Sequence, residues 1–327
     1  MCKGNIMTNT VYLKCPSAKL PREERFDALM ANIDAWLESD AFQYLVRLFG
    51  GTRAKGDTLK TRVQAYNEFV EIWDYRKNAA NGGERWLITE NQFNSEHKRQ
   101  IMDCVQRLGL LDITKCDEKP DYILPLGGAR MANLDRCLGA AHAAALFPNA
   151  DIPVVALTGM RPINEIERPY VDTYAPGAET EYDAICQGMV KAFSLNPDQY
   201  TEIRETDSNQ NLSWAERKYS PDSQTSGRKY CVLSAPSSDP LRRANSMDSF
   251  NYFLIKYALG AGERVLLVTS CIYVPFQLMK FTSLAMEKGF EVDCIGHNGG
   301  STGSVLNTSS YLQEVKATVN AIHSLLN

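Results

Sequence analysis

The chain has 327 residues, of which 44% are hydrophobic and 23% are charged, and its formal net charge is −4. This length and composition predict a globular protein with one large α/β domain and an extension, or with two domains. The slight acidity argues against a general nucleic-acid or membrane-surface binder, because both functions favour a basic face.

The cysteines and the N-terminus indicate the compartment. Nine cysteines are scattered along the chain and are never spaced as C-x-x-C, which fits neither a disulfide framework nor a zinc site. No segment approaches the run of about 18 apolar residues that is typical of a membrane span, and the N-terminus lacks the apolar stretch of a signal peptide. We therefore expect a cytoplasmic protein with reduced thiols, no metal site and no membrane span.

Residues 1–115 are expected to form a helical region. Apolar residues recur at steps of three and four between Phe26 and Val46, and again between Val63 and Trp73, which is the spacing of one helix face. The aromatic residues in these runs are interpreted as core side chains, with a cofactor-binding role as the alternative. Two further elements are expected in this region, a short strand at 85–89 and a helix at 94–108.

The stretch Asp121–Arg136, DYILPLGGARMANLDR, predicts a strand, a tight turn and a helix. Glycines at such a turn let backbone N–H groups approach a phosphate, sulfate or carboxylate, and the helix start adds the positive end of its dipole. Gly127 and Gly128 are followed by Ala129 and Arg130, so the dinucleotide pattern G-x-G-x-x-G is absent. The turn is therefore either an anion cradle or a purely structural feature.

Residues 116–327 alternate between strand and helix patterns and predict an α/β domain. Buried strands are expected at 122–126, 152–157, 229–234, 264–269 and 290–295. The first two should be parallel neighbours, because a helix-length crossover joins them. Gly127, Gly128, Gly159 and Arg161 would then lie together at the carboxyl edge of the sheet. Arg161 is either an anion ligand there or a solvated loop charge.

Polar segments separate these strands. Residues 162–177 are expected to form a loop or lid, and residues 198–228 a polar surface insertion with little order. A helix should start near Glu179, whose carboxylate either complements the helix dipole or points at a ligand. Asn245 or Ser246 could cap a later helix that carries Asp248 in its first turn.

Several of these motifs occur together in one known family. DYILPLGGA, PVVALTG, Ala178-Glu179-Thr180 and Asn245–Ser249 precede the strand RVLLVTS in this order. With these motifs, the region from Asp121 to Ile295 resembles the YdcF, SanA and ElyC family of bacterial proteins. A competing placement of the fourth motif at Ser208–Ala215 matches the family spacing less well.

The resemblance implies a Rossmann-like three-layer domain with a mostly parallel sheet, preceded by the N-terminal helical extension. It also implies a nucleotide-like or phosphate-bearing ligand, with S-adenosylmethionine bound by at least one member, and a link of envelope members to surface polysaccharide and its lipid carrier. Glu179 and Asp248 would be the catalytic carboxylates of a transferase or hydrolase. The expected ligand contacts are Gly127, Gly128, Arg130, Gly159, Arg161, Asn245, Ser246, Thr269, Ser270 and Tyr273.

One departure from the family keeps the function open. The family pattern V-T-S-x-x-H-x-x-R places His and Arg where this chain has Tyr273 and Phe276. Neither substitute titrates near neutrality or grips an anion with two parallel hydrogen bonds. The alternatives are an enzyme, a non-catalytic ligand-sensing or interaction module, and a protein with a vestigial pocket that associates through its N-terminal helices. His142 is interpreted as packing, and His297 as packing or a ligand contact; the substrate and the oligomeric state stay undetermined.

Overall fold

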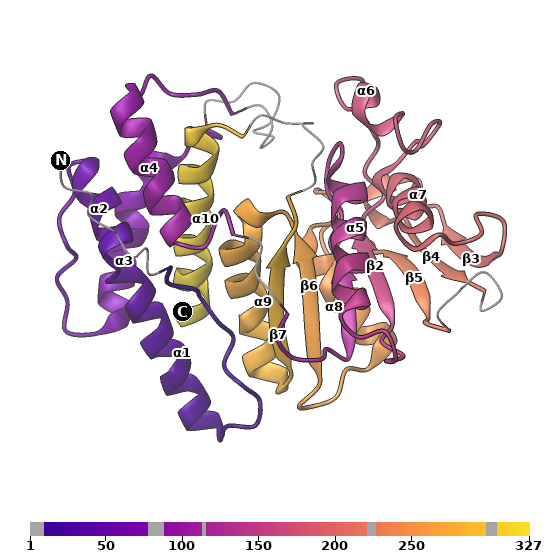
Figure 1. Cartoon of the computed structure of the whole chain (residues 1–327), viewed down its shortest axis with the longest axis horizontal. Helices are drawn as coiled ribbons and strands as arrows, with labels where there is room; N and C mark the ends of the chain where they lie inside the picture. The colour runs from indigo at the N-terminus through magenta and orange to yellow at the C-terminus, as the bar shows by residue number, and fades with distance from the viewer. Residues whose placement is uncertain (1–9, 78–87, 113–115, 221–226, 299–305) are drawn as a thin grey trace. The chain divides into compact units, whose positions relative to one another are not determined.

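The computed structural model describes residues 10–77, 88–112, 116–220, 227–298 and 306–327 (Figure 1). The chain forms two compact units. The helical unit contains the described residues of Met1–Asp112, Cys271–Glu287 and Ser304–Asn327, and the α/β unit those of Ile113–Ser270 and Lys288–Gly303. The first boundary lies close to the one expected at residue 115, whereas two C-terminal segments that we expected in the α/β domain belong to the helical unit.

The helical unit contains α1 (Arg22–Leu37), α2 (Asp40–Leu48), α3 (Leu59–Phe69), η1 (Val70–Trp73), α4 (Ser95–Arg107), η5 (Cys271–Tyr273), α10 (Thr308–Leu326) and all but the last residue of α9 (Val274–Lys288). The expected run from Phe26 to Val46 is divided into two helices, because the Ser39 side chain accepts a hydrogen bond from the Phe42 N–H and starts α2. The strand expected at 85–89 falls mostly outside the described residues, and Ile88 and Thr89 are not in a strand.

Aromatic side chains form the core of the helical unit. Trp36, Phe42, Tyr66 and Trp73 are almost completely buried. The ring of Phe42 lies 5.2 Å from that of Trp36 and 5.1 Å from that of Tyr66, between centroids. Each such contact contributes about 1 kcal/mol beyond the burial of its area. Burial and ring contacts therefore support the interpretation of these aromatic residues as core side chains.

The α/β unit is built on one seven-stranded sheet with the order β3-β4-β5-β2-β1-β6-β7. Its strands are β1 (Tyr122–Pro125), β2 (Val154–Thr158), β3 (Tyr200–Glu205), β4 (Trp214–Tyr219), β5 (Tyr230–Ser234), β6 (Arg264–Thr269) and β7 (Glu291–Gly296). Five strands, β5, β2, β1, β6 and β7, are parallel, which confirms the expected pairing of the first two strands. β4 pairs antiparallel with β5, and β3 pairs antiparallel with β4.

The segment 198–228 differs from the prediction. It contains β3, the short helix η3 (Gln210–Leu212) and β4, and β4 pairs with β5 in the sheet. The composition of this segment did not reveal the strands, because β3 is fully exposed and β4 buries only Ala215, Glu216 and Tyr219 within a largely polar sequence. Residues 221–226 lie outside the described part of the chain.

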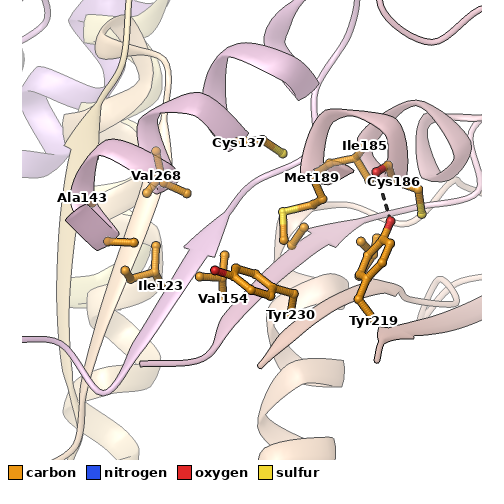
Figure 2. Packing of buried hydrophobic residues seen from close by; sticks show 14 of the residues in the cluster. Ile123, Cys137, Ala143, Val154, Ile185, Cys186, Met189, Tyr219, Tyr230 and Val268 are labelled. Carbon is orange, nitrogen blue, oxygen red and sulfur yellow. Dashed lines mark hydrogen bonds between the residues drawn. The ribbon is translucent and has the colours of Figure 1, made fainter. Parts of the chain in front are cut away.

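Helices cover both faces of the sheet. α5 (Ala132–Ala145) and α7 (Glu181–Phe193) pack on one face, where Cys137 and Met189 join Ile123 and Val154 in a buried cluster (Figure 2). Tyr122 points to the opposite face, because side chains alternate along a strand, and its ring lies 5.3 Å from that of Phe253 in α8 (Ser246–Tyr257). The unit is therefore a Rossmann-like three-layer α/β structure, and the protein carries N-terminal helices, as the sequence predicted.

Candidate functional site

The strand order reverses between β1 and β6. The chain runs from β1 to β2 and then to β5 on one side, and returns to β6 on the other side of β1. In open parallel sheets, ligands bind beyond the carboxyl ends of the strands at this switch point. The candidate site therefore lies beside the turn Gly127–Gly128, which follows β1, and Ser270, which follows β6.

Arg136 of α5 occupies this switch point. Its Nη1 donates to the carbonyl oxygens of Leu126 at 3.0 Å and Gly127 at 2.5 Å, and its Nε and Nη2 lie 3.3 Å from Ser270 Oγ. Arg136 is only 5% exposed. One buried guanidinium thus joins the ends of β1 and β6.

The glycine turn is explained by packing. Gly127 N–H donates to Leu157 O at 2.6 Å, and Gly128 N–H donates to Asn133 Oδ1 at 2.8 Å. A Cβ atom on Gly127 would lie 2.7 Å from Thr158 Oγ1, and one on Gly128 would lie 2.9 Å from Arg136 Nη1. Both N–H groups of the expected anion cradle are therefore already bonded within the protein, and binding an anion there would break these bonds.

Arg130 contacts the segment that follows β2. It has a φ of 54°, its carbonyl oxygen accepts a hydrogen bond from Tyr174 Oη at 2.9 Å, and its guanidinium lies 4.7 Å from the ring centroid of Tyr170. These contacts explain Arg130 without a ligand.

Arg161 is part of a buried ionic cluster. Its two terminal nitrogens lie 2.7 and 2.6 Å from the carboxylate oxygens of Glu167, and Nη2 also lies 2.8 Å from Glu181 Oε1. Burial alone would lower the pKa of Arg161, but the hydrogen bonds and charges of the two glutamates outweigh it and raise this pKa. Arg161 is therefore not a solvated loop charge. Its guanidinium is bonded to two glutamates, which compete with any anion for the same N–H groups.

The segment 162–180, which includes the loop or lid expected at 162–177, is irregular apart from one short helix, and it is packed within the α/β unit. It contains α6 (Arg168–Val171), and Val171, Tyr174 and Ala175 are buried in a small apolar cluster. Ile163 N–H donates to Glu179 O at 2.9 Å, which closes the segment at its two ends. The cluster around Arg161 therefore fixes this segment within the α/β unit.

Glu179 is exposed. Its backbone bonds to Ile163 and Asp183, while Thr180 and Asp183 form the capping box of α7. Within the described ranges, its carboxylate has no hydrogen bond or ion pair. Glu181, two residues later, is the carboxylate that reaches Arg161.

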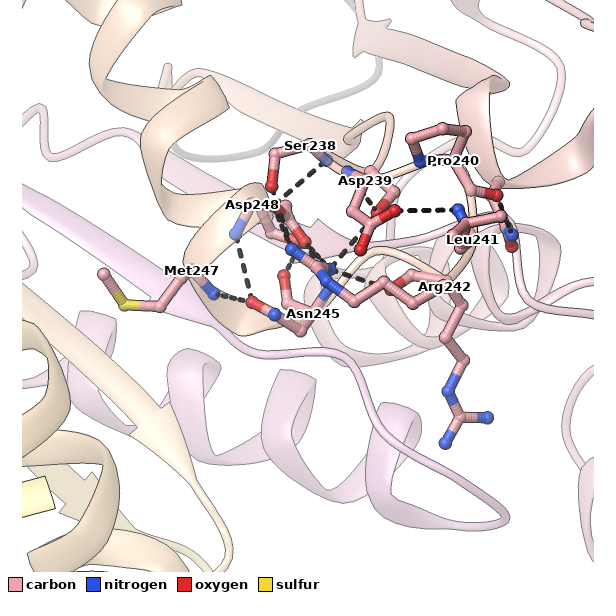
Figure 3. Close-up of polar contacts among 12 residues, drawn as sticks. Ser238, Asp239, Pro240, Leu241, Arg242, Asn245, Met247 and Asp248 are labelled. Carbon is pink, nitrogen blue, oxygen red and sulfur yellow. Dashed lines mark hydrogen bonds and ion pairs between the residues drawn. The ribbon is translucent and has the colours of Figure 1, made fainter. Parts of the chain in front are cut away.

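Asp248 is held by the first turn of α8 and the preceding loop (Figure 3). Its carboxylate accepts hydrogen bonds from the Asn245 N–H at 2.8 Å, the Ser238 N–H at 3.2 Å and Arg242 Nη1 at 2.5 Å. Burial alone would raise the pKa of Asp248, but the bonds from Arg242, Ser238 and Asn245 hold it well below its usual range. Asp248 stays ionised at neutral pH, which does not suit acid–base catalysis.

The start of α8 lies at the carboxyl edge of β2. A Cβ atom on Gly159 would lie 3.5 Å from that of Ala244, and Ser249 Oγ donates to Thr158 O at 2.9 Å. The structure therefore brings together Gly159 and the exposed Asn245, the N-cap of α8, together with Ser246.

Two strand ends carry buried hydroxyl groups. Thr269 Oγ1 and Ser234 Oγ have no hydrogen-bond partner among the described residues. Tyr273 lies in η5 and Phe276 in α9, and both belong to the helical unit.

His297 packs against α5. A Cβ atom on Gly139 would lie 2.7 Å from His297 Cβ, and the ring of the exposed His142 lies 5.4 Å away, between centroids. Burial, with a contribution from the His142 charge, lowers the pKa of His297. The contacts agree with the packing interpretation.

Sequence reasoning missed Asn133, Arg136, Glu167 and Arg242. The first two were detectable, because they lie three residues apart on the buried face of α5, where Cys137 and Ala140 are apolar. Glu167 and Arg242 were not detectable, since their ion pairs with Arg161 and Asp248 depend on the conformation of loops.

The fold and this edge define an α/β protein with a Rossmann-type strand order and an added helical unit. The model of a family described as the Rv3785 N-terminal domain matches residues 21–109, which include α1 to α4. Over 337 aligned residues, the chain is 28% identical to the uncharacterized protein Rv3785 of Mycobacterium tuberculosis (strain ATCC 25618 / H37Rv). It is equally similar to the uncharacterized protein Mb3814 of Mycobacterium bovis, and each alignment covers 95% of this chain and 93% of the relative. No solved structure matches.

These matches overturn the expected membership in the YdcF, SanA and ElyC family. The similarity to the Rv3785 proteins extends over nearly the whole chain and includes the N-terminal helices, which the earlier resemblance left out. The expectations of S-adenosylmethionine binding and of a role in surface polysaccharide rested on that resemblance and lose their support. No helix in the described ranges has both the length and the apolarity needed to cross a bilayer.

Proposed function

We propose that the α/β unit binds a small, phosphate-bearing molecule at the carboxyl edge of its sheet. The observation that carries this proposal is the guanidinium of Arg136, which joins the ends of β1 and β6 where the strand order reverses. Sheets with this strand order bind nucleotides at that place, and a guanidinium is the side chain best matched to phosphate.

Polar groups along the edge support the same ligand class. Ser270, beside Arg136, is partly exposed at the end of β6, and Asn245 and Ser246 begin α8 beyond β2. Gly159 follows β2 beside the start of α8, and it has no side chain that would cover this part of the edge. Phosphate oxygens would accept hydrogen bonds from the hydroxyl and amide groups, within the positive potential of Arg136.

The contacts of the two candidate catalytic carboxylates favour binding over catalysis. Asp248 is bonded to Arg242 and to backbone N–H groups, and Glu179 is exposed. We therefore infer a ligand-binding or sensing module, with a transferase or hydrolase as the competing function. We also place the protein in the cytoplasm, supported by the absence of a disulfide among its described cysteines.

Thermal unfolding with ADP, ATP and inorganic phosphate tests the site. We expect at least one of these probes to stabilise the wild type, by about 2.7 kcal/mol at 100 times its Kd, and to have no effect on Gly159→Leu. Gly159 tolerates a side chain, since its backbone is not in the left-handed region and a Cβ would meet only ordinary contacts. Ile255→Ser, at a position that is 77% exposed on α8, serves as the control and should respond like the wild type. The absence of stabilisation by all three probes, or an unchanged response of Gly159→Leu, would contradict the site.

The competing function is tested by incubating the protein with the same nucleotides and measuring their consumption. Turnover that Asp248→Asn abolishes while the variant stays folded would establish an enzyme and reject the non-catalytic interpretation. We expect no turnover, because the Asp248 carboxylate is not free to accept or release a proton at neutral pH.

A further inference from the structure

β3 is an exposed and regular edge strand. It lies at the outer end of the sheet, with β4 on its inner side (Figure 1). All six of its residues are exposed, including Ile203 at 58%, and all six pair with β4 without a bulge. The strand also lacks proline and lysine, which often protect sheet edges from pairing with another chain.

The pairing with β4 fixes which backbone groups face outward. Ser220 N–H donates to Gln199 O at 3.0 Å, which makes these two residues a hydrogen-bonded pair. Because such pairs alternate along an antiparallel ladder, Thr201, Ile203 and Glu205 direct their N–H and C=O groups toward β4. The backbone groups of Tyr200, Glu202 and Arg204 therefore face away from the sheet, and no other strand of the described chain pairs with them.

The charge pattern of β3 selects one register for pairing with an identical strand. Outward-facing residues must pair with outward-facing residues, which an axis through any residue of the strand allows, and axes through Glu202 and Ile203 pair the largest part of the strand. An axis at Glu202 would oppose two glutamates, and an axis at Arg204 two arginines, and like charges directly opposite each other destabilise a sheet. An axis at Ile203 instead places Glu202 of each copy opposite Arg204 of the other.

We propose that β3 pairs antiparallel with β3 of a second copy of this chain, around a two-fold axis at Ile203, and so joins the two sheets into one. The exposed Ile203 side chains then meet on the axis, in the closer, non-hydrogen-bonded type of pair. The two Glu202–Arg204 pairs lie on the sheet face that carries Tyr182, which already bonds to Glu202 at 2.7 Å. Because both copies use the same surface, the contact closes as a dimer and does not propagate into fibres.

Analytical ultracentrifugation of the full chain over a concentration series tests the dimer. We expect a monomer–dimer equilibrium whose dissociation constant rises at least about tenfold in Ile203→Lys, because two ammonium groups would face each other in place of an apolar contact. Ile255→Lys is the matched control, since Ile255 is also an exposed isoleucine, at 77%, but lies on α8. A wild type that stays monomeric, or a variant at position 203 that dimerises like the wild type, would overturn the proposal.

Disulfide trapping tests the register itself. Facing Cα atoms lie about 4.5 Å apart in a non-hydrogen-bonded antiparallel pair, within the range that a disulfide spans. Ile203→Cys should therefore form a covalent dimer under mild oxidation. Thr201→Cys should not, because its two copies would be offset by four residues, or about 13 Å. The wild type controls for the native cysteines. Crosslinking of Thr201→Cys in preference to Ile203→Cys would reject the register.

Discussion

Asp248 and Glu179 show why acidic residues at helix starts were ambiguous in the sequence. Both lie near the first turn of a helix, where a carboxylate can cap the backbone, complement the dipole or contact a ligand. Asp248 caps α8 and pairs with Arg242, whereas at α7 the capping role belongs to Asp183 and the contact with Arg161 to Glu181. The sequence correctly predicted that these residues lie at helix starts, but it did not predict which groups their carboxylates would contact.

Asp248→Asn should destabilise the protein by about 2 kcal/mol at pH 7, since it removes a charged partner of Arg242 and weakens the cap. The pKa of Asp248 is lower in the folded than in the unfolded protein, so its contribution is complete above the unfolded pKa of about 3.9 and is lost as the pH falls through the folded pKa. The stability gap between wild type and variant should thus narrow by about 1 kcal/mol at pH 3. Urea unfolding at pH 7 and pH 3 measures this difference in the free energy of unfolding, and Glu179→Gln, at an exposed position, is the control. A gap that is equal at the two pH values would reject the assigned role of Asp248.

At the scale of elements, the five parallel strands were predicted to within about two residues. Most of their sequences, such as RVLLVT for β6, contain continuous apolar runs rich in branched residues, which mark strands buried on both faces, whereas β7 also carries Glu291 and Asp293. β3 was missed because all of its residues are exposed, and β4 because its few buried residues, which include the charged Glu216, do not form an apolar run. The burial of Arg161 was equally hidden, since it depends on Glu167 and Glu181, which the fold of the segment 162–180 brings to it.

Arg161→Met should release this segment. The Glu167 side chain is only 1% exposed, so the loss of its cation leaves a buried carboxylate uncompensated and costs about 3 kcal/mol. Hydrogen exchange should rise first in residues 162–180, whose ends Arg161 joins. The double variant Arg161→Met, Glu167→Gln should recover part of the stability, because it removes the buried charge. A double variant no more stable than the single one would contradict a charge-based role.

On the scale of the whole molecule, the chain passes between the two units four times, at 112/113, 270/271, 287/288 and 303/304. The parallel neighbours β6 and β7 require a crossover connection, and α9, which supplies it, belongs almost entirely to the helical unit. From the sequence, α9 and α10 were expected in the α/β domain, because each follows a strand of that domain in the chain. Which unit a helix joins depends on its packing, as with α10 against α3 and α4, and linear patterns do not reveal that.

This connectivity predicts that damage to the helical unit also destabilises the sheet. Lys316 of α10 has a side chain that is 9% exposed, and its Nζ lies 2.8 Å from Asp74 Oδ2 and 3.1 Å from Glu71 Oε1. Lys316→Met should cost about 3 kcal/mol and lower the Tm by about 4 °C. Lys77→Met is the matched control, because Lys77 pairs with the same acids through a side chain that is 64% exposed, and it should destabilise the protein far less than Lys316→Met.

Hydrogen exchange distinguishes a coupled molecule from two independent units. If unfolding is shared, Lys316→Met should speed exchange of the protected amides of β6 and β7 by about a hundredfold, as much as those of α3 and α10. The reason is covalent: the chain that unfolds in the helical unit includes the link between these two strands. Faster exchange confined to the helices, with β6 and β7 protected as in the wild type, would show that the sheet keeps its fold when that link is loosened, and would reject the coupling.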